Sequence, residues 1–384
     1  MLDAIASLSR LAVEALNLGC DRWSRRAAGV PARIADVTPA WLTAALQRRW
    51  PGCRVRALER LSEDAGTTDR ARVRVNCDRG DDGDGMPPDT LFVKLAPART
   101  STRLFVNLLQ LGRTEVEFYR GIAADVAIDV PRVFLAASAG AAQRFALVLE
   151  DLGARGARFT NVGETLSLAD AEQVMRSLAR LHAGFWDSPR LHTDLAWLRS
   201  RERNPRYRIE RFLCAATLPR GVRRFGDLVP APLQVLVPRL IAARDALEDT
   251  WAAGPLTVVH GDAHAGNLYF LPEGVGFFDW QVVQRGQGMR DVSYFLANSI
   301  PTELRRQHER DLIALYLATL GERGVTPPAF PVAWEQHRAH VWYAFIGAGV
   351  TAAAATLQSE AIVRAGLARS AAAVVDLDSA ALLG

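Results

Sequence analysis

The chain has 384 residues, enough for one large domain or two ordinary ones, and its hydrophobic content of 49% and charged content of 23% are ordinary for a folded globular protein. Its formal net charge of +4 is spread along the chain as arginines interleaved with acids, which excludes the clustered basic surface of a nucleic-acid-binding protein. The four cysteines stand far apart without metal or redox spacing, so we expect free thiols and a cytoplasmic protein.

Residues 1–52 are predicted to form an N-terminal helical extension. The first residues include Asp3 and Arg10 within an amphipathic pattern, which is typical of a helix rather than of a secretory signal. Further on, Thr38 followed by Pro39 predicts a helix start, with a capping hydroxyl and a proline in the first turn.

After residue 53 the pattern changes to short alternating or apolar runs, which indicate strands. Three strands are predicted within RVRALERL (54–61), ARVRVNC (71–77) and TLFVKLA (90–96). The acidic, glycine-rich stretch 78–89 fails the spacing of a calcium loop, so we expect a solvated hairpin loop there.

A helix is predicted over 103–124, followed by two strands near 132–137 and 144–150. Beyond Gly153 the chain becomes mostly helical, with one short strand pair around 268–279. The order predicts an α+β protein, in which a five-stranded sheet with one helix precedes a larger helical part. The apolar stretch 341–357 is short for a bilayer and contains polar residues, so a buried helix is expected rather than a membrane anchor.

Lys94 is the only lysine of the chain, because the other basic residues among the 46 are all arginine. An ammonium group is a compact point charge that can reach between phosphate oxygens, whereas a guanidinium fork needs a wider bidentate site. Lys94 is therefore a candidate for chemistry that arginine cannot perform, although one lysine can also survive by chance.

A second group of candidate residues lies in VVHGDAHAGNLYFLPEGVGFFDWQ, where His260, Asp262 and Asn267 precede Asp279. Asp262 and Asn267 fall on a loop between apolar strands, and Asp279 ends the last strand. Each residue alone is a common turn former. Together, an amide and one carboxylate can hold Mg²⁺ by oxygen, while the other carboxylate accepts a proton.

This pattern resembles the catalytic loop and metal-binding aspartate of the protein-kinase-like phosphotransferases. Over roughly residues 55–300 the chain is similar to the aminoglycoside phosphotransferase and choline kinase superfamily. Its HGD and DWQ motifs resemble the ecdysteroid-kinase-like branch. The resemblance implies a two-lobe fold, with a nucleotide-binding N-lobe at 53–150 and a helical C-lobe at 151–384 that contains the catalytic loop 260–267.

The resemblance also implies ATP and Mg²⁺ as cofactors. Asp262 would be the catalytic base, Asn267 and Asp279 would hold Mg²⁺, and Lys94 would contact the α- and β-phosphates. The helix after Lys94 offers Glu115 and Glu117 as partners for the lysine. The resemblance of EVEFY to the helix motif of the family favours Glu115.

Other segments take their expected roles from the same resemblance. ALVLEDLG looks like the hinge, where backbone groups from Glu150 to Leu152 would bind adenine. His182 and Trp186 are expected in the core, and Asp291 is expected to cap its helix or to brace the catalytic loop. The phosphate-covering loop departs from the family pattern because it offers only Gly66, with Thr67 and Thr68 beside it.

The short stretch of sequence between Asp279 and Asp291 leaves no room for a protein-kinase activation segment. In addition, His264 stands at the position where protein kinases have lysine. The expected acceptor is therefore a hydroxyl of a small molecule, with neither nucleic acid nor membrane as partner. The sequence has no feature that sets an oligomeric state or that distinguishes ATP from GTP.

Three alternatives remain open at this point. His260 and His264 are four residues apart, as in zinc hydrolases, but the usual glutamate beside the first histidine is absent. A non-catalytic, pseudokinase-like nucleotide binder is compatible with the glycine-poor loop. An aminoglycoside acceptor would call for an acidic pocket, yet residues 301–384 contain eight acids against seven arginines.

The helical part offers aromatic side chains in place of acids, which favours a hydrophobic alcohol as the acceptor. These are Trp197, Tyr207, Phe212, Phe330, Trp334, Trp342, Tyr343 and Phe345, most of which are expected to be core residues.

Overall fold

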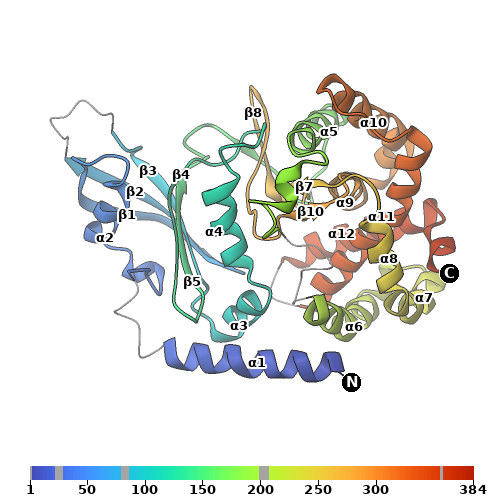
Figure 1. The fold of residues 1–384 in the computed structure, drawn as a ribbon, viewed down its shortest axis with the longest axis horizontal. Coiled ribbons are helices and arrows are strands. Elements are labelled where there is room, and N and C mark those ends of the chain that lie inside the picture. Colours follow the sequence, from blue (N-terminus) through green and yellow to red (C-terminus); the bar gives the residue numbers. More distant parts are fainter. Residues whose placement is uncertain (1, 22–28, 79–85, 199–206, 355–357) are drawn as a thin grey trace. The chain divides into compact units, whose positions relative to one another are not determined.

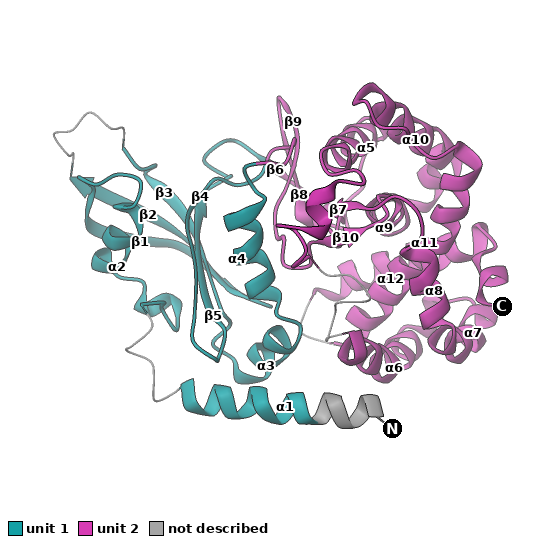
Figure 2. Ribbon diagram, viewed as in Figure 1, with its two compact units in different colours: residues 1–124, 130–157 teal, residues 125–129, 158–384 magenta. Residues whose placement is uncertain are grey.

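A computed structural model describes residues 2–21, 29–78, 86–198, 207–354 and 358–384 (Figure 1). The chain divides into two compact units, which Figure 2 colours separately. Unit 1 consists of Met1–Ala124 and Val130–Ala157, and unit 2 of Asp125–Asp129 and Arg158–Gly384. The hairpin loop expected between the second and third strands lies, over residues 79–85, outside the described residues.

Unit 1 contains the predicted five-stranded sheet, which is antiparallel and has the strand order β1-β2-β3-β5-β4. The strands are β1 Arg54–Ala65, β2 Asp69–Asp78, β3 Thr90–Leu95, β4 Val133–Ala139 and β5 Arg144–Glu150. The helices are α1 Leu2–Asp21, α2 Pro39–Leu46, α3 Thr100–Leu108 and α4 Leu111–Gly121, with a 3₁₀ turn, η1, at Ile34–Asp36.

The alternation of β2 distinguishes the two faces of this sheet. Ala71, Val73 and Val75 are buried in one hydrophobic cluster together with the apolar side of α2, and the arginines between them point to the other face. Helix α2 begins as predicted, because the Thr38 hydroxyl accepts a hydrogen bond from the Trp41 N–H at 3.2 Å.

The single helix predicted over 103–124 is wrong, since the structure has two helices, α3 and α4, separated at Leu109 and Gln110. Gln110 adopts a left-handed conformation with φ of 51°. The turn lets α4 approach β5 so closely that a Cβ atom on Gly112 would lie 2.1 Å from the Phe145 ring. Neither Pro nor Gly occupies the turn itself, so residue propensities did not indicate a helix break there.

Unit 2 is mostly helical, as predicted. Its α-helices are α5 Leu168–Ala183, α6 Tyr207–Arg224, α7 Ala231–Ala242, α8 Arg244–Trp251, α9 Met289–Ser299, α10 Thr302–Glu322, α11 Phe330–Ala353 and α12 Glu360–Asp376. Its 3₁₀ turns are η2 Pro189–His192, η4 Gly226–Leu228, η5 Ala265–Asn267 and η6 Ser379–Leu383.

The strand pair predicted around 268–279 is present as β8 Leu268–Leu271 and β9 Gly274–Phe277, and β6 Arg158–Phe159 joins it to form three strands. A further antiparallel pair joins β7 Thr257–Val259, the apolar strand expected before the loop, to β10 Gln284–Gly286, which was not predicted. Strand β10 is three residues long, which is too short for a period to be recognised.

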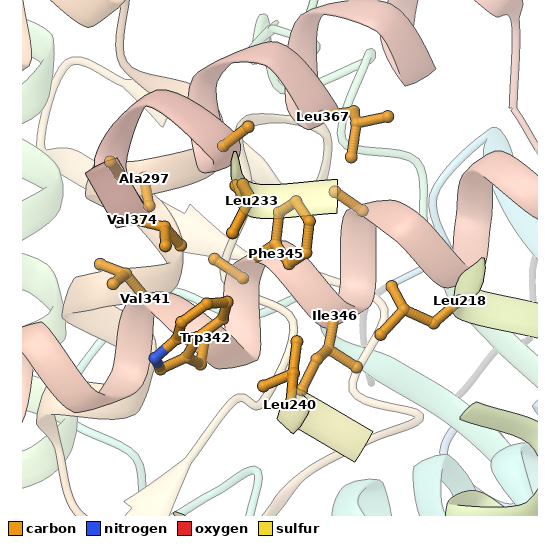
Figure 3. Packing of buried hydrophobic residues seen from close by; sticks show 14 of the residues in the cluster. Leu218, Leu233, Leu240, Ala297, Val341, Trp342, Phe345, Ile346, Leu367 and Val374 are labelled. Carbon is orange, nitrogen blue, oxygen red and sulfur yellow. The ribbon is translucent and has the colours of Figure 1, made fainter. Parts of the chain in front are cut away.

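Helix α11 lies in a hydrophobic core cluster of unit 2 (Figure 3). Val341, Trp342 and Phe345 of this helix are fully buried among side chains of α6, α7, α9 and α12, including Leu218 and Leu367. The apolar stretch 341–357 thus contributes a buried helix, as expected, through Ala353. Within the described residues, every helix is too short or too polar to cross a bilayer.

Candidate active site

The loop 260–267 follows β7 and leads into β8, and its shape depends on Gly261. This glycine has a left-handed φ of 82°, and a Cβ atom at its position would lie 2.5 Å from the Val282 carbonyl oxygen. A side chain would therefore meet backbone as well as strain. The glycine between His260 and Asp262 is thus required by the turn that presents Asp262.

Asp291 of α9 holds this loop in place through hydrogen bonds to the loop backbone. Its carboxylate accepts hydrogen bonds from the N–H groups of His260 at 2.6 Å and Gly261 at 2.8 Å. His182 of α5 lies with Nε2 3.2 Å from the same carboxylate, and its Nδ1 lies 2.8 Å from the Tyr316 hydroxyl. All of these groups are buried. Asp291 and His182 therefore hold the loop in place from the core.

Asp262 and Asn267 are joined directly. The Asn267 side-chain amide donates to the Asp262 backbone carbonyl at 2.9 Å and to the Asp262 carboxylate at 3.0 Å. Both N–H groups of Asn267 thus face Asp262, and its amide oxygen points the opposite way. Asp262 thus contributes a carboxylate to the site, and Asn267 contributes a neutral amide oxygen.

The environment of Asp262 favours its ionised form. Burial raises the pKa of this carboxyl, but the positive charge of His264 and the nearby donor groups of His264 and Tyr294 lower it more, to about 2. The His264 Nε2 atom lies 3.6 Å from the carboxylate. Burial lowers the pKa of His264 in turn, yet the Asp262 charge raises it above its ordinary value.

Two tyrosines lie beside Asp262: Tyr294 was not singled out from the sequence, and Tyr343 was named only as one of several aromatic residues of the helical part. The Tyr294 hydroxyl of α9 helps to lower the pKa of Asp262, and the Tyr343 hydroxyl of α11 donates to the Gly261 carbonyl at 2.7 Å. Their rings are 5.5 Å apart. A signal existed for Tyr294, because it follows Asp291 by three residues and so shares its helix face. Nothing local marks Tyr343.

Asn267 and Asp279 come together through the β8–β9 hairpin. Leu268 pairs with Phe277, and the next residue, Phe278, donates its N–H to the Asn267 carbonyl at 3.1 Å. Asp279 follows in a left-handed conformation with φ of 65°, and Gln281 donates to its carboxylate at 2.6 Å. An amide oxygen and a carboxylate are oxygen donors that suit Mg²⁺, which commonly takes few protein ligands and completes its shell with phosphates and water.

The zinc-hydrolase alternative is not supported by the contacts of His260. Its Nε2 atom lies 3.0 Å from the Phe278 carbonyl, and its Nδ1 accepts from the Asp262 N–H at 3.2 Å. Both ring nitrogens are thus engaged, and neither presents a lone pair to a metal. In the described part of the chain, no group of three or more His, Cys, Asp or Glu side chains could hold a metal ion.

In unit 1, Lys94 of β3 and Glu115 of α4 form an ion pair with Nζ to oxygen distances of 2.7 and 2.9 Å. The two side chains are 5% and 1% exposed. Glu117, the other candidate partner, lies 3.8 Å from Arg120 and is 38% exposed. The structure thus pairs Lys94 with Glu115.

The remaining predicted residues of unit 1 lie at the β1–β2 turn and after β5. In the turn, the Gly66 N–H donates to the Thr68 carbonyl at 2.9 Å; Thr68 is buried and Thr67 half-buried. In the hinge segment, the Glu150 N–H donates to the Arg132 carbonyl, and the Leu152 carbonyl accepts from two following N–H groups.

The carboxylates of the hinge segment are also engaged. Glu150 is bound by Arg132 and Arg155, and Asp151 accepts two hydrogen bonds from Arg72 of β2, at 2.8 and 3.0 Å to one of its oxygens. Of the two other residues assigned to the core, His182 is fully buried and Trp186 is half-buried.

Unit 1 contains a sheet with a buried lysine–glutamate pair, and unit 2 is helical and contains a loop with an interacting Asp and Asn. These features are typical of a phosphotransferase with the protein-kinase-like fold. The chain belongs to the phosphotransferase enzyme family (APH), whose family model matches residues 76–339.

One solved structure with a TM-score above 0.5 supports the fold, and others are less similar. A candidate aminoglycoside phosphotransferase from Ralstonia eutropha JMP134 is 15% identical, with 89% of this chain and 97% of that chain covered and a TM-score of 0.51. Choline kinase from Cryptosporidium parvum is 10% identical, with 90% and 96% covered and a TM-score of 0.49. The amicoumacin kinase hAmiN in complex with AMP-PNP and Ca²⁺ is 13% identical, with 83% and 88% covered and a TM-score of 0.49. No curated protein matches the chain.

Proposed function

We propose that the protein transfers the γ-phosphate of ATP to a hydroxyl group of a small molecule. The observation that carries this proposal is the buried Lys94–Glu115 pair. A buried ion pair is rarely a net source of stability, so its presence calls for another reason. An ammonium group fixed by a carboxylate on the following helix is the arrangement that aligns nucleotide phosphates in kinases.

The nucleotide would be held by groups of unit 1. Lys94, oriented by Glu115, would contact the α- and β-phosphates, and the turn with Gly66, Thr67 and Thr68 would offer N–H and hydroxyl donors. The hinge side chains are engaged by arginines. Adenine would therefore be recognised by backbone, through the Glu150 carbonyl and the Leu152 N–H.

The chemistry would be carried by unit 2. Asp262 would orient the acceptor hydroxyl and receive its proton as the bond to phosphorus forms, and Asn267 and Asp279 would hold Mg²⁺. The cation, when bound, neutralises charge on the β- and γ-phosphates. Because Asp262 is a weak base, its main contribution would be to align the hydroxyl, with proton transfer late in the reaction.

We propose a hydrophobic alcohol as the acceptor, as the ecdysteroid-like motifs suggest. Support comes from the surroundings of Asp262, where Tyr294 and Tyr343 provide aromatic rings. Burial raises the pKa of Tyr343 to about 12 and that of Tyr294 well above its ordinary value, so both phenols stay neutral. A pocket for a polycation would instead need several carboxylates. An acceptor screen by ADP release in which only aminosugars react would overturn this assignment.

The test of the proposed function is a thermal shift of the purified protein with ATP and Mg²⁺, compared with the Lys94→Ala variant. A ligand that binds only the folded state raises the melting temperature according to its affinity. We expect a magnesium-dependent rise that the variant lacks. The absence of any shift with ATP or GTP would contradict the proposal, and nucleotide binding without transfer to any hydroxyl, water included, would support the pseudokinase alternative.

A further inference from the structure

Arg70 lies directly opposite Lys94 in the sheet of unit 1. The register of β2 and β3 pairs Arg70 with Lys94, between the pairs Asp69 with Leu95 and Ala71 with Val93. Residues directly opposite in an antiparallel pair point to the same face, with Cβ atoms about 5 Å apart. Two cations therefore stand side by side on the sheet face from which Lys94 reaches Glu115 (β1 to β3 in Figure 1).

The Arg70 side chain is directed toward the β1–β2 turn. Its Nη2 atom lies 3.4 Å from the place where a Cβ atom on Gly66 would be. The guanidinium forms an ion pair with Asp64 of β1, and its side chain is 35% exposed. Arg70 thus reaches the segment that was expected to cover the nucleotide phosphates.

Like charges directly opposite in a sheet destabilise it, unless an anion lies between or beside them. Lys94 has Glu115, which is buried, whereas Arg70 has Asp64, whose side chain is 70% exposed and so is well screened by water. The guanidinium can therefore exchange this partner at little cost. A phosphate group is the anion that a guanidinium fork binds best.

The β1–β2 turn is also poor in the groups that normally bind phosphate here. It has one glycine, Gly66, and the N–H of that glycine is already bonded to the Thr68 carbonyl. A glycine-rich loop binds phosphate through such N–H groups. A side chain must therefore supply the positive charge that would bind phosphate in place of these N–H groups. Among the residues of this turn and its flanks, Arg70 carries such a charge.

We propose that Arg70 binds the phosphates of the nucleotide beside Lys94, in place of the missing backbone donors of a glycine-rich loop. This inference rests on the proposed function, because it requires a nucleotide at the sheet of unit 1. It assigns to Arg70 the phosphates beyond the α-phosphate, since the side chain extends from Lys94 toward the turn.

The test is the affinity of Arg70→Met for ATP, ADP and AMP, measured by calorimetry in the presence of Mg²⁺. Loss of a charge-assisted contact should weaken ATP and ADP about 10- to 100-fold and AMP much less. The matched control is Arg74→Met, because Arg74 lies on the same strand and face and pairs with Glu59 of β1 as Arg70 pairs with Asp64. Arg74→Met should bind all three nucleotides as the wild type does.

Asp64→Asn separates phosphate binding from a role in shaping the turn. If Arg70 binds phosphate, this variant keeps the affinity of the wild type or gains some, since the competing carboxylate is gone. The inference would be overturned if Arg70→Met kept the wild-type affinity or lost affinity equally for all three nucleotides. It would also be overturned if Asp64→Asn bound ATP as weakly as Arg70→Met. A wild-type protein that binds no nucleotide would overturn the proposed function itself, and the inference with it.

Discussion

At the scale of single residues, Asp262 is the side chain whose state matters most to the proposed reaction. Its carboxylate faces His264, Tyr294 and Asn267, so hydrogen-bond donors surround it. A carboxyl whose pKa is lowered to about 2 is ionised at neutral pH. In the proposed mechanism it would orient the acceptor hydroxyl while ionised and would take the proton only once phosphoryl transfer has begun.

Asp262→Asn should lower kcat about 10²- to 10⁴-fold, which is the usual contribution of a positioned acid or base. The affinity for ATP should stay close to that of the wild type, because Asp262 is proposed to contact the acceptor hydroxyl and not the nucleotide. Steady-state kinetics with a hydroxyl acceptor and calorimetry with ATP measure the two effects. Near wild-type turnover would contradict the assignment of Asp262, and Asp194→Asn, at an exposed position, is the control.

His264→Gln should raise the pKa of Asp262. The largest influence on this carboxyl is burial, which raises its pKa, and His264 supplies the main opposing charge. Without that charge, protons bind to the carboxylate at a higher pH than in the wild type. The pKa can be followed by the ¹³C signal of labelled aspartate, assigned with Asp262→Asn. His192→Gln, at an exposed position, is the control and should leave the signal unchanged. An unchanged signal in His264→Gln would mean that the ion pair between His264 and Asp262 is absent.

At the scale of elements, helix α4 shows how register decides which carboxylate reaches the site. Glu115 and Glu117 are two residues apart, which places them on different sides of a helix. Glu115 faces the sheet and is buried, whereas Glu117 faces Arg120 and water. The turn at Gln110 sets this orientation, because a continuous helix from residue 103 would give α4 a different direction.

Glu115→Gln should lower the free energy of unfolding by about 3–5 kcal/mol, because it leaves the Lys94 ammonium buried without its carboxylate. Glu117→Gln is the matched control on the same helix, and the loss of its exposed pair should cost less than about 1 kcal/mol. Urea denaturation of both variants measures the difference. Equal effects would mean that the Lys94–Glu115 pair does not form in solution.

Particular elements show what could be predicted from the sequence. The five strands of unit 1 were recognised because each alternates or is apolar over several residues, and the 260–279 segment because its spacing is specific. The break between α3 and α4 and the three-residue strand β10 were missed, since long-range packing determines them.

The candidate site divides in the same way. Asp262 and Asn267 interact within one loop, so local spacing was enough to group them. Tyr343 reaches the same loop from α11, and Arg70 faces Lys94 through strand register. Such contacts depend on how elements pack, which a single sequence does not specify.

At the scale of the whole molecule, the N-terminal helix α1 belongs to unit 1. Asp21 at its end is bound by Arg144 of β5 at 2.9 Å and by Arg103 of α3 at 3.2 Å. Arg144 is almost completely buried. Glu14 of the same helix accepts a hydrogen bond from Gln143 at 3.0 Å. The helix thus supplies the charge that lets an arginine lie inside the unit.

Asp21→Asn should destabilise the protein by about 3–5 kcal/mol, because it leaves two largely buried arginines without their shared carboxylate. Asp36→Asn removes an exposed ion pair with Arg33 in the same unit and should cost less than about 1 kcal/mol. Chemical denaturation compares the two variants. Similar midpoints would show that α1 is not anchored as described.

The solitary Lys94 also gives the molecule a single site for proteases that cut only after lysine. Such an enzyme can cleave this chain at one peptide bond, between Lys94 and Leu95, and yield two fragments. That bond lies in a central strand, with both flanking side chains buried, so digestion requires the sheet to open first. The rate at which two bands replace one on a gel would therefore report, without any label, how often the strand that bears the lysine comes free.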